Sequence, residues 1–273
     1  MFAKGIALPV LHITGARSLI AAATLLVFLL ATRSGVRVHR AGHYGVMAVL
    51  GLLLCAHWLA YFQALKASTA AVAILALHTY PVVTALVEPL VFGERFRRID
   101  LGVALLVFGG VLIMTPEISL SNATTRGVAL GVVSGLFFMA RNLMTRKYVR
   151  QYPGSTLMFW QVLVTGLVLL PVLVVNDANG YSPRSVGLLL LLGIVFTALP
   201  QTLFAASFRH LSARTVGVLA TLLPFYGAFW GYVVHNEIVT VRTAIGGSLI
   251  LACVVFETTR SVRGSARSGR RGP

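Results

Sequence analysis

Apolar runs of about 20 residues, separated by short polar connections, follow one another along almost the entire chain. Because the hydrocarbon core of a bilayer is ~30 Å thick, about 20 residues of α-helix are needed to cross it. Each run therefore predicts a membrane-spanning helix. The nine predicted spans are residues 14–32, 44–65, 69–92, 99–115, 126–148, 155–175, 185–208, 214–234 and 240–258. The pattern thus predicts an all-α polytopic membrane protein.

The pattern repeats in the second half of the chain, with one constant offset between the aligned positions. The pairs that align are Gln63–Lys66 with Ala206–Arg209, Thr69–Ala70 with Ser212–Ala213, Pro81 with Pro224, and Glu94 with Glu237. Two similar helical halves are the usual construction of a secondary transporter, whose substrate site lies near the middle of the membrane between them. We expect a first repeat at 1–118, a second at 126–259, and a disordered basic cytoplasmic tail at 260–273. Transport is therefore the leading functional hypothesis.

The first repeat is one helix short. When the span 126–148 is shifted back by the offset that aligns Pro224 with Pro81, it falls before the start of the chain, except for a few residues around Met1–Gly5. Lys147 then aligns with Lys4. We expect a full protein of ten helices in two sets of five, in which Met1 is an internal methionine or the chain is truncated.

Composition places the chain in a bilayer. Hydrophobic residues make up 57% of its 273 residues and only 11% are charged, whereas about a quarter of the residues in a soluble domain are charged. The formal net charge of +16 does not indicate nucleic-acid binding, because the charges lie in short loops and not on one stripe with interleaved aromatic residues. We expect no nucleic-acid partner.

Connections that are rich in Lys and Arg alternate with connections that are poor in them. The connections of one side, together with the C-terminal tail, hold sixteen Lys and Arg residues, and those of the other side hold four. Since Lys and Arg mark the cytoplasmic side of a membrane, the C-terminus is expected in the cytoplasm. Twenty arginines against three lysines are typical of a GC-rich bacterial genome, so the expected location is a bacterial inner membrane.

Short motifs recur at matching places in the two repeats. They are Ala64–Ala70, Tyr80-Pro81 and Gly93–Arg95 in the first repeat, and Leu211–Ala213, Leu223-Pro224 and Asn236-Glu237 in the second. A glycine-bearing helix follows each set. These motifs resemble the EamA-type permeases of the drug/metabolite transporter superfamily. The resemblance implies two inverted repeats of five helices and the export or import of small metabolites. Asn236 departs from it, standing where a second Gly is expected.

One face of the span 69–92 gathers polar side chains around a proline. His78, Pro81, Ala85 and Glu88 follow at steps of three and four residues, so they share a helix face. Ionisable groups inside a membrane are costly and usually face a cavity or a partner. This face is a candidate wall of the substrate pathway, with Glu88 as a proton or cation site. The alternatives are that Glu88 reaches interfacial water or an arginine, and that His78 is a buried neutral side chain bound to a backbone carbonyl.

Two prolines occupy equivalent places. Pro81 and Pro224 fall inside predicted spans, and a proline removes a backbone hydrogen bond and kinks a helix. Discontinuous helices in matching positions point to a substrate site, although transmembrane prolines also shape packing. Tyr80, Phe225 and Tyr226 flank the prolines and are candidate walls of the pathway.

Other aromatic and amide side chains fall at matched depths. Trp58 and Tyr61 align with Gln201 and Phe204, and Gln161 is a second amide in an apolar span. Amides in such spans need internal partners. Gln161 and Gln201 therefore either bind substrate or hold helices together.

Two arginines lie inside predicted spans. Arg17 is one turn into its span near the outer face, and Arg141 is about one turn from the inner end of 126–148. Both are candidate contacts for a carboxylate group of a substrate. The alternative is that their side chains snorkel to the membrane interface.

A few residues are assigned structural roles. Gly127, Gly131 and Gly135 recur every four residues on one helix, a spacing that lets helices pack closely. Glu94 and Glu237 open the helices that follow them, where a carboxylate meets the positive end of the helix dipole.

Motifs for enzymatic chemistry are missing from the sequence. It contains no Gly-x-x-x-x-Gly-Lys-Ser/Thr loop, no His-Glu-x-x-His motif and no Gly-x-Ser-x-Gly elbow. Cys55 and Cys253 lie in apolar segments without metal-ligand spacing, which favours packing roles. We expect a protein that is not an enzyme and has no cofactor or metal.

Taken together, these patterns predict a secondary permease that moves small metabolites, with amino acids or related compounds as the first choice and export as the direction. The alternatives are a multidrug or cation efflux permease, and a lipid-handling protein or helper subunit without transport of its own. The expected partners are a small-molecule substrate and the lipid bilayer, and a homodimer is left open.

Overall fold

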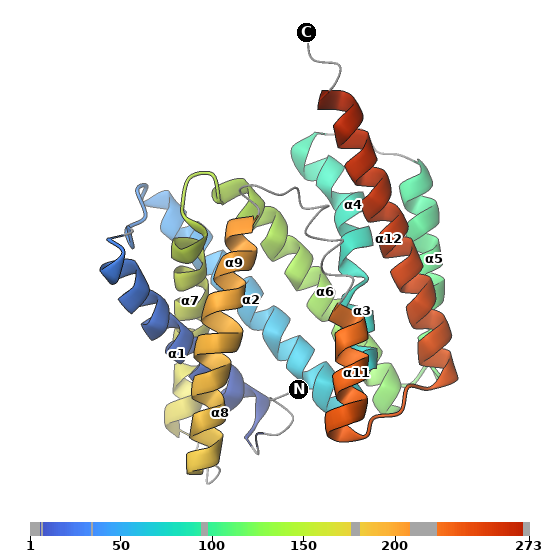
Figure 1. The fold of residues 1–273 in the computed structure, drawn as a ribbon, viewed down its shortest axis with the longest axis horizontal. Coiled ribbons are helices and arrows are strands. Elements are labelled where there is room, and N and C mark those ends of the chain that lie inside the picture. The colour runs from blue at the N-terminus through green and yellow to red at the C-terminus, as the bar shows by residue number, and fades with distance from the viewer. Residues whose placement is uncertain are drawn as a thin grey trace. The chain divides into compact units, whose positions relative to one another are not determined.

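A computed structural model describes residues 6, 8–33, 35–93, 98–175, 181–207 and 223–269, with the side chains of 92, 225, 235, 258 and 261–269 left out. Every regular element in these ranges is a helix (Figure 1), which confirms the all-α prediction for the described residues. The helices are α1 (Val10–Ala31), α2 (Gly42–Ala67), α3 (Ala70–Leu77), α4 (Tyr80–Phe92), α5 (Arg98–Met114), α6 (Ala123–Tyr148), α7 (Gly154–Val175), α8 (Pro183–Gly193), the π-helical turn η2 (Ile194–Ala198), α9 (Leu199–Ser207), α11 (Leu223–His235) and α12 (Val241–Gly269).

Six helical segments are long and apolar enough to cross a membrane, judged by length and composition. They are Val10–Ala31, Gly42–Ala67, Ala70–Val91, Ala123–Tyr148, Gly154–Val175 and Pro183–Ser207. Each coincides closely with a predicted span. The other three predicted spans overlap α5, α11 and α12. Six candidate spans are therefore supported in the described ranges, and the count of nine stays a prediction.

The helices form two compact units, each drawn from both repeats. Unit 1 comprises Met1, Gln63–Met139 and Leu211–Pro273, and unit 2 comprises Phe2–Phe62 and Ala140–His210. The division in space therefore differs from the division in sequence, which was predicted to fall between residues 118 and 126.

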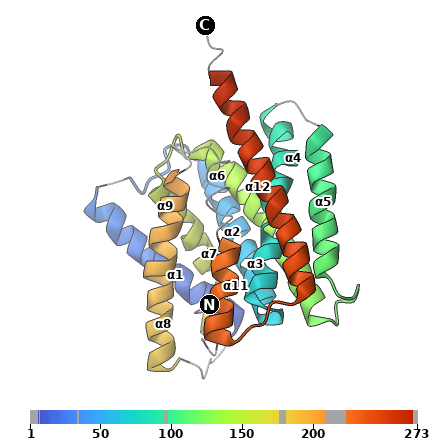
Figure 2. The same ribbon diagram turned by 45° about the vertical axis from the view of Figure 1, so that its right-hand side comes forward.

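Among the described residues, the helix pair with the most extensive packing in each unit is a pair of repeat equivalents. The offset that aligns Pro81 with Pro224 also maps α1 onto α7 and α5 onto the first part of α12. α1 packs chiefly against α7 in unit 2, and α5 against α12 in unit 1. The α5–α12 pair lies side by side in both views (Figures 1 and 2). The sequence repeat thus corresponds to neighbouring helices inside one unit.

The α1–α7 pair is antiparallel and closely packed. Gly15 of α1 approaches Leu169, whereas Leu19, one turn later, approaches Gly166. A Cβ atom added to Gly166 would lie 2.6 Å from Cδ2 of Leu19. Residue numbers therefore fall along α7 as they rise along α1, and glycines allow the two helices to approach each other.

The α5–α12 pair has the same antiparallel geometry. Gly110 lies against Ile250, and Met114, one turn later, lies against Gly246. A Cβ atom at Gly110 would be 2.8 Å from Cγ1 of Ile250 and 2.9 Å from the carbonyl oxygen of Gly246. The glycine-bearing helices that carry the family resemblance are therefore in direct contact.

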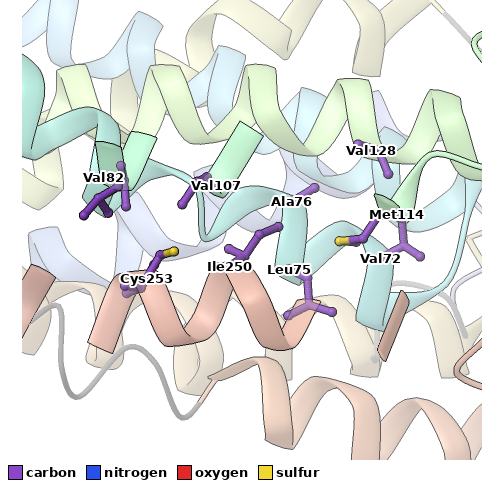
Figure 3. Close-up of a cluster of buried hydrophobic side chains, with 11 residues drawn as sticks. Val72, Leu75, Ala76, Val82, Val107, Met114, Val128, Ile250 and Cys253 are labelled. Carbon is purple, nitrogen blue, oxygen red and sulfur yellow. The ribbon is translucent and has the colours of Figure 1, made fainter. Parts of the chain in front are cut away.

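The apolar core of unit 1 surrounds this pair (Figure 3). Its buried members are Val72, Leu75, Ala76, Val82, Val103, Val107, Met114, Val128, Ile250, Cys253 and Val254. Ile250 and Cys253 point from α12 toward Val107 of α5. Cys253 is a free, buried thiol inside this core, in agreement with the packing role predicted for it.

α6 packs against α3 through its glycines. A Cβ atom at Gly131 would lie 2.6 Å from Cβ of Ala76, and one at Gly135 would lie 2.8 Å from the carbonyl oxygen of Leu77. Gly127 is equally close to the segment just before α3. These contacts confirm the structural role predicted for the three glycines.

The N-terminus of α3 is capped from another part of unit 1. The backbone N–H of Ala70 donates to Oε2 of Glu237 at 2.6 Å, and the backbone N–H of Val72 donates to Oγ1 of Thr69 at 3.2 Å. The sequence predicted that Glu237 would serve the helix following it. The carboxylate instead meets the positive end of α3, because tertiary packing brings that end within its reach.

α12 continues as a helix to Gly269, where the sequence predicted a disordered tail from residue 260. Arg260 forms an ion pair at 2.7 Å with Glu257, one turn earlier, and a second ion pair with Asp100 at the start of α5. These contacts extend the ordered helix past the apolar segment.

Candidate functional site

The predicted span 69–92 is broken in the middle. α3 ends at Leu77 and α4 begins at Tyr80, with a turn at His78 and Thr79 between them. Pro81 is the second residue of α4. The first N–H groups of a helix have no intrahelical partner, so a proline at this position costs α4 no hydrogen bond. The helical hydrogen-bond pattern is thus interrupted at His78–Thr79, just before the proline.

His78 lies at this break and is buried, with 1% of its surface exposed. Its Nδ1 donates to the carbonyl oxygen of Ile74 at 2.7 Å, so the predicted bond to a backbone carbonyl is present. Its ring is 6.0 Å from that of Tyr80, and Tyr80 packs edge-to-face on Phe138 at 4.9 Å between centroids. The structure therefore brings two predicted pathway residues, His78 and Tyr80, together.

The helix face predicted to join His78, Pro81, Ala85 and Glu88 continues only within α4. His78 lies across the break, as the C-cap of α3. Glu88 is 8% exposed, while Pro81 and Ala85 are half-buried. The Glu88 carboxyl group is therefore enclosed by protein, in a span where burial of an ionisable group is costly.

The second repeat presents a similar helix start. Pro224 is buried and is the second residue of α11, as Pro81 is of α4. Tyr226, two residues later, is 60% exposed. The side chain of Phe225 and the segment 208–222 lie outside the described residues, together with the motif before α11.

Arg17 lies over aromatic rings of α2. Its Cζ atom is 3.8 Å from the ring centroid of Trp58 and 5.0 Å from that of Phe62. Trp58 and Phe62 are one turn apart, so they share a helix face. Arg17 is 5% exposed and Trp58 3%. The guanidinium is thus buried against aromatic faces, an arrangement worth about 2 kcal/mol or more when desolvated, and it does not snorkel to an exposed position.

Tyr61 belongs to the same group. It lies on the same stretch of α2, where its ring contacts that of Phe62 at 5.7 Å between centroids and stacks on His57 at 6.3 Å. We call Arg17, Trp58, Tyr61 and Phe62 the Arg17 cluster. Sequence reasoning named three of its members and missed Phe62, although the spacing of Phe62 from Trp58 was a signal for it.

Arg141 occupies a second buried position in unit 2. Its Nε donates to Oε1 of Gln161 at 2.6 Å, and its Nη2 lies 3.4 Å from the sulfur of Met158. Arg141 is 1% exposed and Gln161 is fully buried. The amide therefore ties α6 to α7, which matches the interpretation of Gln161 as a side chain that holds helices together.

Gln201 and Phe204 are in unit 2, the same unit as Trp58 and Tyr61, with which they align. Both side chains are half-buried. Oε1 of Gln201 is buried and has no hydrogen-bond partner among the described residues. The repeat-related aromatic and amide positions of α2 and α9 therefore belong to one unit.

Acidic residues are distributed unequally. Unit 2 contains one, Asp177, which lies outside the described residues, and the other six of the chain are in unit 1. Sequence reasoning singled out Glu88 in its span but missed that Asp100 pairs with Arg260, 160 residues away. The buried charges of unit 2 are thus cationic, and unit 1 holds the buried carboxylates.

Known proteins resemble the chain over most of its length. Pseudopaline exporter CntI of Pseudomonas aeruginosa is 29% identical over 254 residues, which are 93% of this chain and 88% of that protein. An uncharacterised transporter of Archaeoglobus fulgidus is 28% identical over 211 residues, 77% of this chain and 74% of that protein. A crystal structure that is 19% identical, with a TM-score of 0.66, covers 94% of this chain and 90% of its own and has the same fold.

The family is shown by a match in both repeats. The model of the EamA-like transporter family matches residues 1–115 and 125–259. Both matches contain the motifs around Pro81 and Pro224 from which the resemblance was inferred. With its apolar helices and transporter-named relatives, the chain is a multi-pass membrane protein that belongs to the EamA-like transporter family.

Proposed function

We propose that this transporter exports small metabolites, amino acids or related compounds, across a bacterial inner membrane. The observation that carries the proposal is the burial of Arg17 and Glu88 within candidate membrane spans. Such side chains are expensive in a bilayer and mark substrate or ion pathways. Export is supported by CntI, a relative named as an exporter of pseudopaline.

Transport is proposed to follow alternating access between two inverted repeats. An inversion in the membrane plane turns each helix upside down relative to its equivalent. The antiparallel contacts of α1 with α7 and of α5 with α12 support this relation. The complete arrangement of ten helices, with its C-terminus in the cytoplasm, follows from the repeat and from the distribution of Lys and Arg.

The break between α3 and α4 is proposed to line the pathway. Half-helices expose backbone groups that a continuous helix would use internally, and such ends form substrate sites in transporters with repeats. His78 and Tyr80 lie at this break. Pro224 starts α11 in the equivalent place, which supports a second contribution from the other repeat.

Glu88 is proposed to couple export to protons. Its carboxyl group is buried within a candidate span, so protonation would remove the cost of burying its charge. A Glu88→Gln variant mimics the protonated form permanently. It is expected to lose flux driven by a pH gradient while keeping substrate exchange.

Two other functions fit less well. Efflux of lipophilic cations is disfavoured because the described buried charges of unit 2 are positive. A lipid-handling or helper role without transport is disfavoured because several relatives are named as transporters.

A growth assay tests the proposal. The chain is expressed in a sensitised bacterial host and challenged with toxic amino-acid analogues, dipeptides, purine analogues and lipophilic cations. We expect resistance to an amino-acid analogue or a related compound, abolished by Glu88→Gln and unaffected by Arg184→Gln, a change at an exposed position. Increased sensitivity would indicate uptake instead of export. Resistance to lipophilic cations alone, or no change with the protein present in the membrane, would contradict the proposal.

A further inference from the structure

We propose that Arg17 binds the carboxylate group of an anionic substrate, with Trp58 and Phe62 as the aromatic surface that holds its guanidinium in place. This inference deepens the proposed function and rests on it, because the ligand is the exported compound. Its basis is a buried cation in a unit that has almost no acidic residues.

The charge of Arg17 has no carboxylate counterpart among the described residues of unit 2. The unit has a single acidic residue, Asp177, outside those residues. Burying a cation costs free energy unless a partner offsets it. The rings of Trp58 and Phe62 supply part of that stabilisation, but they supply no negative charge. An anionic ligand would complete it.

The position of Arg17 over the rings leaves its Nε available as a hydrogen-bond donor. An arginine whose plane lies on an aromatic face has its N–H groups directed outward in that plane. Nε of Arg17 is buried and has no hydrogen-bond partner among the described residues. A carboxylate is the group whose two oxygens match this planar set of donors.

A second donor lies on the same face of α1. Thr14 precedes Arg17 by three residues, a spacing that places both side chains on one side of the helix. Oγ1 of Thr14 is fully buried and likewise has no hydrogen-bond partner among the described residues. The Thr14 hydroxyl and Nε of Arg17, both buried and both without a partner among the described residues, are a pair of donors for an anion.

Arg141 differs from Arg17 in what it contacts. Its Nε donates to Gln161 and its Nη2 is near Met158, so two of its three nitrogens connect α6 and α7, whereas Nε of Arg17 has no hydrogen-bond partner among the described residues. Arg17 contacts only rings among the interactions described for its guanidinium. The site is therefore assigned to Arg17, and Arg141 keeps a structural role.

The surroundings also indicate the rest of the ligand. Trp58 and Phe62, with Tyr61 packed against Phe62, form a mainly apolar surface beside the guanidinium. A carboxylate attached to an aromatic or aliphatic body would satisfy the charge and contact these rings. Benzoate is a simple compound of this kind, and benzamide is its neutral counterpart of nearly equal size.

Binding to the purified protein in lipid nanodiscs tests the proposal without requiring transport. Benzoate and benzamide are titrated into the wild type, Arg17→Gln, Arg17→Lys and Arg184→Gln. Arg184→Gln removes the same charge from an exposed position of unit 2. We expect benzoate to bind more tightly than benzamide, and Arg17→Gln to weaken benzoate binding by about tenfold or more, as loss of a charge-assisted hydrogen bond does. Arg17→Lys should recover part of the affinity, and Arg184→Gln should match the wild type.

Several outcomes would overturn the assignment. They are equal binding of benzoate and benzamide, no benzoate binding to the wild type, or unchanged benzoate binding by folded Arg17→Gln. Thermal unfolding of Arg17→Gln, Asp177→Asn and the double variant provides a further check. If each single change destabilises the protein and the double change does not, Asp177 is the partner of Arg17 and the site does not exist. Resistance in the growth assay combined with any of these results would leave export standing and remove only the anion site.

Discussion

Unit 1 and unit 2 bury opposite charges and stabilise them differently. Unit 1 encloses the carboxylates of Glu88, Asp100 and Glu257, and Arg260 neutralises two of them where α12 meets α5. Unit 2 encloses Arg17, which contacts aromatic rings, and Arg141, which contacts an amide and a thioether. Charge in unit 1 thus joins helices to each other, whereas Nε of Arg17 in unit 2 has no hydrogen-bond partner among the described residues.

The units are alike in how their helices approach. Each is built around an antiparallel pair of repeat equivalents, α5 with α12 and α1 with α7, and each pair meets at glycines. The similarity follows from the repeat and the difference follows from individual side chains. Packing and charge can therefore be altered separately by single substitutions.

The largest effect is expected from closing the space at Gly131 in unit 1. A Cβ atom there would lie 2.6 Å from Cβ of Ala76, so Gly131→Leu must push α6 away from α3. We expect a loss of about 3 kcal/mol or more in unfolding free energy, at the upper end of overpacking effects, seen as aggregation or a much lower unfolding temperature. Gly102→Leu is the control, because nothing lies within 4 Å of its Cβ position. Equal behaviour of the two variants would refute the close α3–α6 contact.

Arg260→Gln should be the next most damaging change. It leaves Asp100 and Glu257 without the cation that joins them, and removing one partner of a buried ion pair costs up to about 3–5 kcal/mol, less here because Arg260 is partly exposed. Arg242→Gln, an exposed position on the same helix, should leave stability nearly unchanged. Thermal unfolding that ranks the two variants equally would mean that this ion-pair group does not stabilise unit 1.

A smaller effect is expected at Gln161 in unit 2. Gln161→Leu removes the acceptor for Nε of Arg141 and should cost about 1–3 kcal/mol, the usual penalty for an unsatisfied buried donor to a charged group. Gln161→Glu keeps an acceptor and should retain most of the stability. The two variants are compared by thermal unfolding in nanodiscs, and identical losses would argue against the Arg141–Gln161 hydrogen bond.

Much of the helical framework could be predicted from the sequence. Apolar length alone located the six candidate spans, because the thickness of a bilayer sets helix length. The repeat also indicated which helices pack together. The offset that aligns Pro81 with Pro224 maps α1 onto α7 and α5 onto α12, and these equivalents are packing partners. What hydropathy did not show was the break at His78 and Thr79. A window average has the same value for one helix as for two half-helices.

The site was less accessible to prediction because it depends on distant contacts. The burial of Arg17 depends on Trp58 and Phe62 of another helix, and the sequence alone allowed snorkelling equally well. Asp100 and Arg260 are 160 residues apart, with no local pattern to connect them. The types of the critical residues could thus be recognised in advance, but not which side chains they contact.

The central claim is that Arg17 of unit 2 sets the affinity for an anionic substrate and Glu88 of unit 1 sets the response to protons. Flux measured in proteoliposomes, with and without a pH gradient and as a function of the concentration of the compound identified by the growth assay, tests it most directly. We predict that Arg17→Gln raises KM by about tenfold or more and keeps the acceleration by the gradient. Glu88→Gln should keep exchange and lose that acceleration. If both variants alter the same quantity, or if Arg17→Gln leaves KM unchanged, the division of roles between the two units is contradicted.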